Sequence, residues 1–176
     1  MTRIRINLDA MESLNYFWQA LKDREKASEQ FLADVAQLAG YQLIYDEEFT
    51  AESVRRVMSA LSNHEPFRAD NKKEGRLYNN HLWMMDDLEV AQAMLQPIKV
   101  LNLADLEQSL GDSLSPEEIS IYFVPFHTEA VEVKGDSVVL NFFKVMVDLM
   151  GGDDVTFEGK PLPEAIEAIL REHFTK

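Results

Sequence analysis

Three polar residues within eight positions, Asn80, His81 and Asp87, are the strongest candidates for chemistry in this chain. They belong to residues 77–95, a stretch of helical length that lacks Gly and Pro and carries apolar side chains on two faces. Such a helix is typical of the middle of a bundle, where polar groups must be satisfied or exposed. His81 falls on the main apolar stripe. A histidine there is more often a hydrogen-bonded core residue than an acid–base group, although its ordinary pKa suits proton transfer.

Asp87 has two interpretations, because a carboxylate buried without a partner costs several kcal/mol. The favoured one is a structural tie between helices, in which Asp87 pairs with an arginine such as Arg24, Arg55, Arg56 or Arg76. The alternative is a polar pocket, closed by the polar break that interrupts the apolar stripe of the first predicted helix near Ser28. The candidate pocket residues are Arg24, Glu25, Arg76, Asn80, His81 and Asp87.

The one local concentration of basic residues in the sequence lies in residues 64–76, a segment predicted to be a loop with at most a turn of helix after Asp70. This segment leads into the central helix, and backbone N–H groups at a helix N-terminus favour anions. It is therefore a candidate anion site, with Arg68, Lys72 and Lys73 as contacts. A solvated loop explains the same residues equally well, because carboxylates within the segment dilute the charge.

The signatures of the common enzyme classes are missing. The chain has no cysteine, which excludes disulfides, thiolate zinc sites and thiol nucleophiles. It also has no G-x-G-x-x-G, G-x-S-x-G or H-E-x-x-H motif. The histidines have neither a second histidine at i+3 or i+4 nor a glutamate three residues earlier: His64, His81, His127 and His173. We therefore expect no metal and no cofactor, and the absences favour a protein without catalytic activity.

The net charge of −14 is unevenly distributed. From residue 82 onward there are 6 basic and 18 acidic residues, whereas the first 81 residues hold 11 and 13. Because an acidic surface repels phosphate backbones, direct nucleic-acid binding is disfavoured. The leading hypothesis is an acidic interaction or regulatory protein that binds a partner, or a second copy of itself, through its acidic second half. The alternatives are a small-molecule or anion-binding protein or enzyme with the pocket above, and a nucleic-acid mimic.

The expected location is the cytoplasm. The first residues lack the apolar region of a secretory signal, and no apolar run reaches the ~18 residues that a membrane span requires. The absence of cysteine agrees with a reducing compartment.

The pattern of elements predicts an α+β fold in a single integrated domain, residues 1–176. Residues 1–96 are mainly helical around the central helix at about 77–95, after an edge strand at 2–8 and a long helix at 9–39 capped by Asp9. A further helix follows Thr50 as its N-cap. Residues 97–176 are mainly an antiparallel sheet with a C-terminal helix from Pro163, and the expected strands are 98–101, 119–124, 130–133, 137–147 and 155–157.

One more candidate contact lies at the end of the strand predicted at residues 119–124. Pro125 ends ladder pairing there, which places Phe126 and His127 in a loop. An exposed Phe beside a His is a candidate partner contact, although such a Phe more often folds over a sheet edge.

Overall fold

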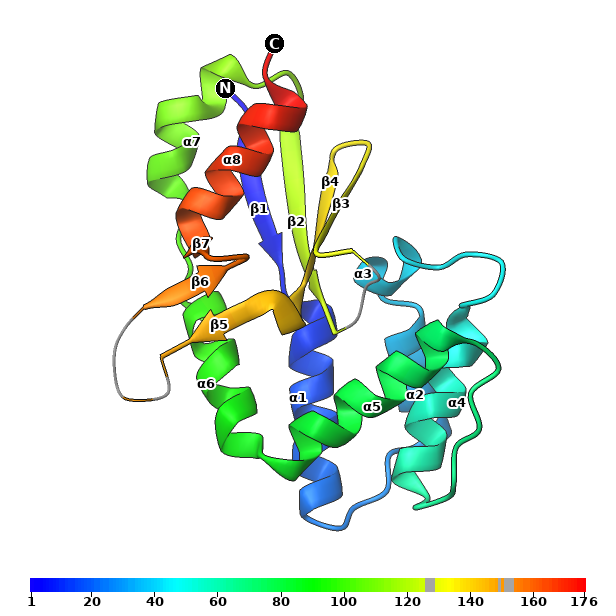
Figure 1. Cartoon of the computed structure of the whole chain (residues 1–176). Helices are drawn as coiled ribbons and strands as arrows, with labels where there is room; N and C mark the ends of the chain where they lie inside the picture. Colours follow the sequence, from blue (N-terminus) through cyan, green and yellow to red (C-terminus); the bar gives the residue numbers. More distant parts are fainter. Residues whose placement is uncertain (126–128, 149, 151–153) are drawn as a thin grey trace.

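The computed structural model describes residues 1–125, 129–148, 150 and 154–176. Within these ranges it confirms an α+β fold (Figure 1). The helices are α1 (Asp9–Lys22), α2 (Glu29–Ala36), α3 (Ala39–Gln42), α4 (Ala51–Ser62), α5 (Lys72–Asp86), α6 (Leu88–Lys99), α7 (Ala104–Leu110) and α8 (Leu162–Phe174), with short 3₁₀ turns η1 (Gly111–Ser113) and η2 (Phe142–Lys144). The strands are β1 (Arg3–Asn7), β2 (Glu118–Val124), β3 (Val131–Lys134), β4 (Ser137–Asn141), β5 (Val145–Val147), β6 (Val155–Phe157) and β7 (Lys160–Pro161).

The strands form two sheets. The larger one has the order β1-β2-β4-β3 and the smaller one the order β5-β6-β7. The expected antiparallel pairing is present in the smaller sheet and in the β3–β4 hairpin, whose strands are joined at Gly135-Asp136. The pairs β1–β2 and β2–β4 are parallel, so the larger sheet is mixed. Parallel pairing requires a long connection, and the helices between β1 and β2 supply one. β1 lies at an edge, as expected.

The predicted central helix is broken in two at Asp87. α5 ends at Asp86 and α6 begins at Leu88, and between them Asp87 adopts a non-helical conformation with φ −141° and ψ 85°. Its side chain accepts a hydrogen bond from the backbone N–H of Val90 at 3.2 Å. Asp87 therefore acts as the N-cap of α6, because a short carboxylate competes with the helix for nearby backbone donors.

The predicted helix 9–39 is also broken, into α1, α2 and α3. α1 ends near Arg24, which has a left-handed φ of 62°, and Ser28 caps α2 by accepting a hydrogen bond from the N–H of Phe31. The expected cap at Asp9 is wrong: α1 begins at that residue, whose N–H donates to the Asn7 side chain. The strand expected at 98–101 is wrong too, because Ile98 and Lys99 form the last turn of α6.

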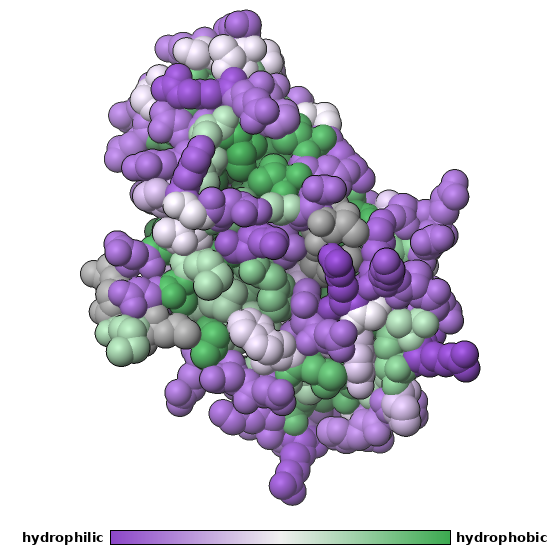
Figure 2. Space-filling view, in the orientation of Figure 1, coloured by the Kyte–Doolittle hydropathy of each residue, from purple (hydrophilic) through white to green (hydrophobic). Residues whose placement is uncertain are grey.

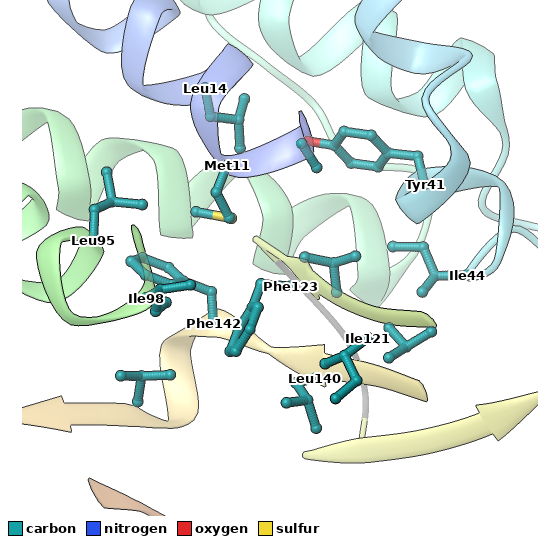
Figure 3. Close-up of a cluster of buried hydrophobic side chains, with 14 of the residues drawn as sticks. Met11, Leu14, Tyr41, Ile44, Leu95, Ile98, Ile121, Phe123, Leu140 and Phe142 are labelled. Carbon is teal, nitrogen blue, oxygen red and sulfur yellow. The ribbon is translucent and has the colours of Figure 1, made fainter. Parts of the chain in front are cut away.

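One hydrophobic core joins helices of the first half to the larger sheet (Figure 3). Helices α1, α3 and α6 contribute apolar side chains on one side, and β2, β4 and η2 contribute them on the other. The residues labelled in the figure are Met11, Leu14, Tyr41, Ile44, Leu95, Ile98, Ile121, Phe123, Leu140 and Phe142. The amphipathic C-terminal helix is confirmed as α8, which buries Ile166, Leu170 and Phe174.

The two ends of the chain lie together at one end of the larger sheet (Figure 1). There the N–H of Thr2 donates to the carbonyl of Gly111, and the N–H of Lys176 donates to the carbonyl of Ser113, each at 3.0 Å. The smaller sheet lies nearer the middle of the molecule, and the junction between α5 and α6 lies towards the end opposite the termini (Figure 1). None of the helices in the described ranges is both long enough and apolar enough to span a membrane.

Candidate functional site

His81 is a core residue of α5. Its side chain is 1% exposed, and its Nδ1 accepts a hydrogen bond from the indole N–H of Trp18 at 3.0 Å. The ring of Phe17 lies edge-on at 5.9 Å between centroids. Burial lowers the pKa of His81 to about 3, which keeps the imidazole neutral at physiological pH. Its Nε2 has no hydrogen-bond partner among the described residues. A neutral, enclosed ring is poorly suited to exchange protons with a substrate.

The other predicted pocket residues do not converge on His81. Asn80 donates from Nδ2 to the carbonyl of Pro125 at 3.0 Å. Asp87 is exposed and caps α6, and within the described ranges it has no ion pair, so the predicted tie to an arginine is absent. Arg24, Glu25 and Arg76 are exposed. The structure thus leaves the six candidates divided between solvent, a helix cap and the core.

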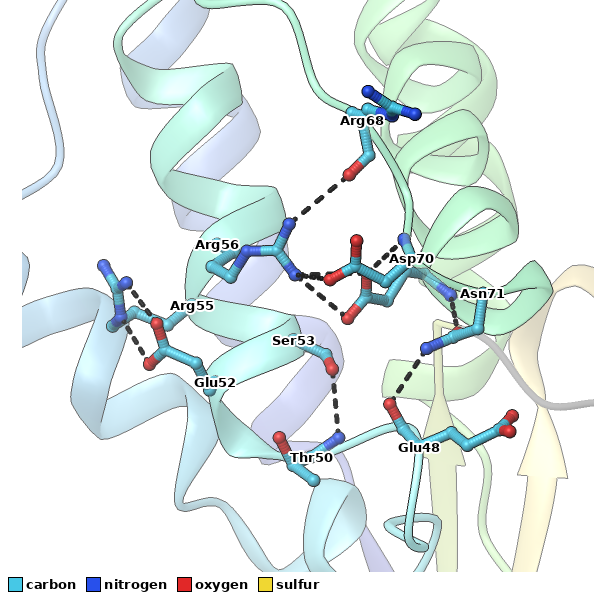
Figure 4. A network of polar contacts seen from close by, with 10 residues as sticks. Glu48, Thr50, Glu52, Ser53, Arg55, Arg56, Arg68, Asp70 and Asn71 are labelled. Carbon is cyan, nitrogen blue, oxygen red and sulfur yellow. Dashed lines mark hydrogen bonds and ion pairs between the residues drawn. The ribbon is translucent and has the colours of Figure 1, made fainter.

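The predicted basic loop is organised by Arg56 of α4 (Figure 4). Its Nη1 lies 3.2 Å from the carboxylates of Asp70 and Glu74, and its Nη2 donates to the carbonyl of Arg68 at 3.3 Å. The guanidinium also lies over the ring of Phe67, 5.3 Å from the centroid. These contacts hold the segment before α5 against α4, and α5 begins at Lys72, earlier than the sequence predicts.

The N-terminus of α5 already carries its own acceptors. Asn71 accepts from the N–H of Glu74 at 2.9 Å, and the Glu74 carboxylate accepts from the N–H of Asp70 at 3.0 Å. Glu74 is only 3% exposed. Burial raises its pKa, but the Asp70 N–H, the Ser53 hydroxyl and Arg56 outweigh that effect and lower it, so the carboxylate stays ionised. An anion bound at the N-terminus of α5 would be repelled by the ionised Glu74 carboxylate.

The three predicted anion contacts do not gather. Lys73 pairs with Asp46, whereas the side chains of Arg68 and Lys72 are exposed. The candidate partner contacts Phe126 and His127 lie outside the described residues. The candidate sites from the sequence therefore supply no enclosed cluster of functional groups in the described part of the chain.

An exposed apolar surface is the feature that sequence reasoning missed. Trp83 is 56% exposed on α5, Met146 62% on β5 and Val100 65% just after α6. Trp83 belongs to the stretch whose two apolar faces predict a helix in the middle of a bundle, yet its side chain is exposed. Its ring contacts that of Phe143 in η2, 6.0 Å between centroids, which links α5 to the smaller sheet. Figure 2 shows apolar side chains gathered across the middle of one face of the molecule.

Two hollows are lined in part by these exposed side chains, one by Val100 and the other by Trp83. The larger, about 650 Å³, lies between α6, the β5–β6 hairpin and the start of α8, and we call it the hairpin hollow. It is lined by Ala93, Gln96, Pro97, Val100, Leu101, Asn102, Val147, Asp148, Asp154, Val155 and Pro163. The smaller, about 210 Å³, lies where α5 meets α6, and we call it the junction hollow. It is lined by Trp83, Met84, Asp86, Asp87 and Val90.

The charged residues that line the two hollows, within the described ranges, are four aspartates: Asp86, Asp87, Asp148 and Asp154. The remaining lining is apolar except for two amides in the hairpin hollow. Apolar walls bury hydrocarbon, and carboxylates bind cationic groups. The arrangement is therefore suited to binding a molecule that is both apolar and positively charged.

No protein-family model, curated protein or solved structure matches this chain. The described residues also contain no group of three or more His, Asp or Glu side chains placed to hold a metal ion.

Proposed function

We propose that this protein binds a basic protein partner through the acidic surface of its second half and that it acts by binding rather than by catalysis. One observation carries the proposal. The exposed residues Trp83 and Val100 line two hollows whose charged lining residues, in the described part of the chain, are all aspartates.

The exposed apolar side chains and the aspartates each favour a protein partner. Contiguous exposed apolar side chains lose their contact with water when a partner covers them, and tryptophan is enriched among residues that dominate binding energy. The surrounding carboxylates attract a basic partner over distance and disfavour acidic ones. A second copy docked face to face would bring aspartates onto aspartates, so a different, basic partner is favoured. The absence of cysteine agrees with a cytoplasmic partner.

A capture experiment tests the proposal. Tagged wild-type protein and a variant with Asp86→Asn, Asp87→Asn, Asp148→Asn and Asp154→Asn are incubated with lysate of the cells that express the protein, at low salt and at ~0.5 M NaCl. We expect a basic protein that binds the wild type at low salt, is lost from the variant, and is released by salt, because screening shortens the reach of exposed charges. The captured protein must bind again when both are purified.

Other results contradict the proposal. Identical capture by wild type and variant, or capture that salt leaves unchanged, excludes binding through this acidic surface. Should the purified partner bind DNA, competition by duplex DNA tests whether the carboxylates act as a nucleic-acid mimic.

A further inference from the structure

Asp148 and Asp154 stand opposite each other at the end of the β5–β6 ladder. Val147 pairs with Val155, and at the next position the N–H of Asp148 donates to the carbonyl of Asp154 at 3.2 Å. Like charges directly opposite on neighbouring strands destabilise a hairpin. Within the described ranges neither carboxylate has a cationic partner, although one Asp148 oxygen accepts from the N–H of Met150 at 2.9 Å. The pair is therefore an uncompensated concentration of negative charge.

The same two residues line the hairpin hollow, whose walls are mostly hydrocarbon. Pro97 and Val100 form the wall on the α6 side, and Val147 and Val155 form the wall on the hairpin side. A long cationic side chain matches this lining, because its methylene stem is buried along apolar atoms while its charged end reaches polar groups. A volume of about 650 Å³ leaves room for such a side chain together with its neighbours.

Resting on the proposed function, we infer that the hairpin hollow receives an arginine side chain of the partner, whose guanidinium binds Asp148 and Asp154 together. Arginine is favoured over lysine because its planar group presents donors in two directions and can serve two carboxylates at once, whereas an ammonium is a point charge. The occupant is a segment of a protein, because the hollow of about 650 Å³ has apolar walls on both the α6 side and the hairpin side, which a small cation would leave uncovered.

Defined peptides test this inference even while the partner is unidentified. The probe is a short, fluorescently labelled amphipathic peptide of leucine and arginine. Matched peptides carry lysine or citrulline in place of arginine, and citrulline keeps the shape without the charge. Binding is measured by fluorescence anisotropy at ~0.15 M NaCl, where distant charges are largely screened. The arginine peptide should bind best and the citrulline peptide worst.

The decisive variant is Asp148→Asn with Asp154→Asn, since asparagine keeps an acceptor for the N–H of Met150. It should weaken binding of the arginine peptide by about tenfold or more, as expected for lost charge-assisted hydrogen bonds. The matched control, Glu47→Gln with Glu117→Gln, removes two exposed charges at residues that line neither hollow. It should change binding by less than about twofold, since each charge acts from the exposed surface.

The contrary results separate this inference from the proposed function. If the hollow variant and the control bind the peptide equally, or if the lysine peptide binds as well as the arginine peptide, the arginine assignment is overturned. Capture of a basic partner that depends on Asp86 and Asp87 alone would then leave the proposed function standing. If N-acetylarginine amide, added alone, binds as tightly as the peptide, the hollow is a small-molecule site and the inference fails.

Discussion

His81 is a histidine that the fold keeps neutral. Trp18 donates to its Nδ1, and enclosure in the core lowers its pKa to about 3 from an ordinary value of 6.5. Between these values the unfolded chain binds a proton that the folded chain does not. The contribution of neutral His81 to the stability of the fold is therefore complete above pH 6.5, and it is lost progressively as the pH falls toward 3.

The first prediction follows from this difference in pKa. Between pH 7 and pH 5, His81 should lower the free energy of unfolding of the wild type by about 2 kcal/mol. His81→Gln removes the titrating group and keeps an acceptor for Trp18. Between pH 7 and pH 5, the free energy of unfolding of this variant should therefore fall by about 2 kcal/mol less than that of the wild type. Urea denaturation at both pH values measures it. The control is His64→Asn, at an exposed residue. Its free energy of unfolding should fall between the two pH values as much as that of the wild type. Equal losses for His81→Gln and wild type would contradict the assignment.

At the scale of elements, the boundary between α5 and α6 depends on Asp87. Because the side chain caps α6 from a non-helical backbone, Asp87→Ala should cost about 1 kcal/mol of stability, whereas Asp87→Asn should cost little, since asparagine caps equally well. Urea denaturation near pH 7 measures both variants. A tie to an arginine would predict equal losses for the two substitutions, because both remove the charge.

A second element-scale prediction concerns Arg56, which fixes the segment before α5. Arg56→Met should cost about 2 kcal/mol, because it leaves the buried carboxylate of Glu74 without its cation. Its neighbour Arg55 pairs with the exposed Glu52, and Arg55→Met should cost less than about 1 kcal/mol. Chemical denaturation of the two variants gives the comparison. A similar loss in both would mean that Glu74 does not depend on Arg56.

These elements also show where sequence reasoning succeeds. Features set by near neighbours were predicted: the two consecutive strands on either side of Gly135-Asp136, the Thr50 cap and the C-terminal helix near Pro163. The break at Asp87 was missed because apolar periodicity continues across it, and only a side-chain hydrogen bond to the backbone interrupts the helix. Parallel pairing of β1 with β2 joins residues more than a hundred positions apart, and no local pattern encodes it.

The candidate site, like the β1–β2 pairing, is formed by residues that are far apart in the sequence. The hairpin hollow combines residues of α6, the β5–β6 hairpin and Pro163, and their shared position follows from the packed fold rather than from spacing. The charge asymmetry, by contrast, was readable from the sequence alone and indicated the acidic half. What the fold adds is the exposed apolar side chains beside the carboxylates, since Trp83 lies on a helix predicted to be in the middle of a bundle.

At the scale of the whole molecule, the acidic half holds charge that folding does not neutralise. Because Asp148 and Asp154 face each other without a cation in the described part of the chain, they should oppose folding. Asp148→Asn with Asp154→Asn is therefore expected to raise the melting temperature by about 1–2 °C at low salt, and by less at ~0.5 M NaCl. Differential scanning calorimetry measures the shift.

The same double variant is expected to bind the arginine peptide more weakly, so the stability of the fold and the affinity for the peptide should change in opposite directions. That opposition is characteristic of residues kept for function, because a purely structural charge pair would stabilise the fold that contains it. The Glu47→Gln and Glu117→Gln control should show neither effect at comparable size. A fall in the melting temperature of the double variant would mean that the two aspartates hold the hairpin in place, and lost peptide binding would then report a disturbed fold rather than a lost contact.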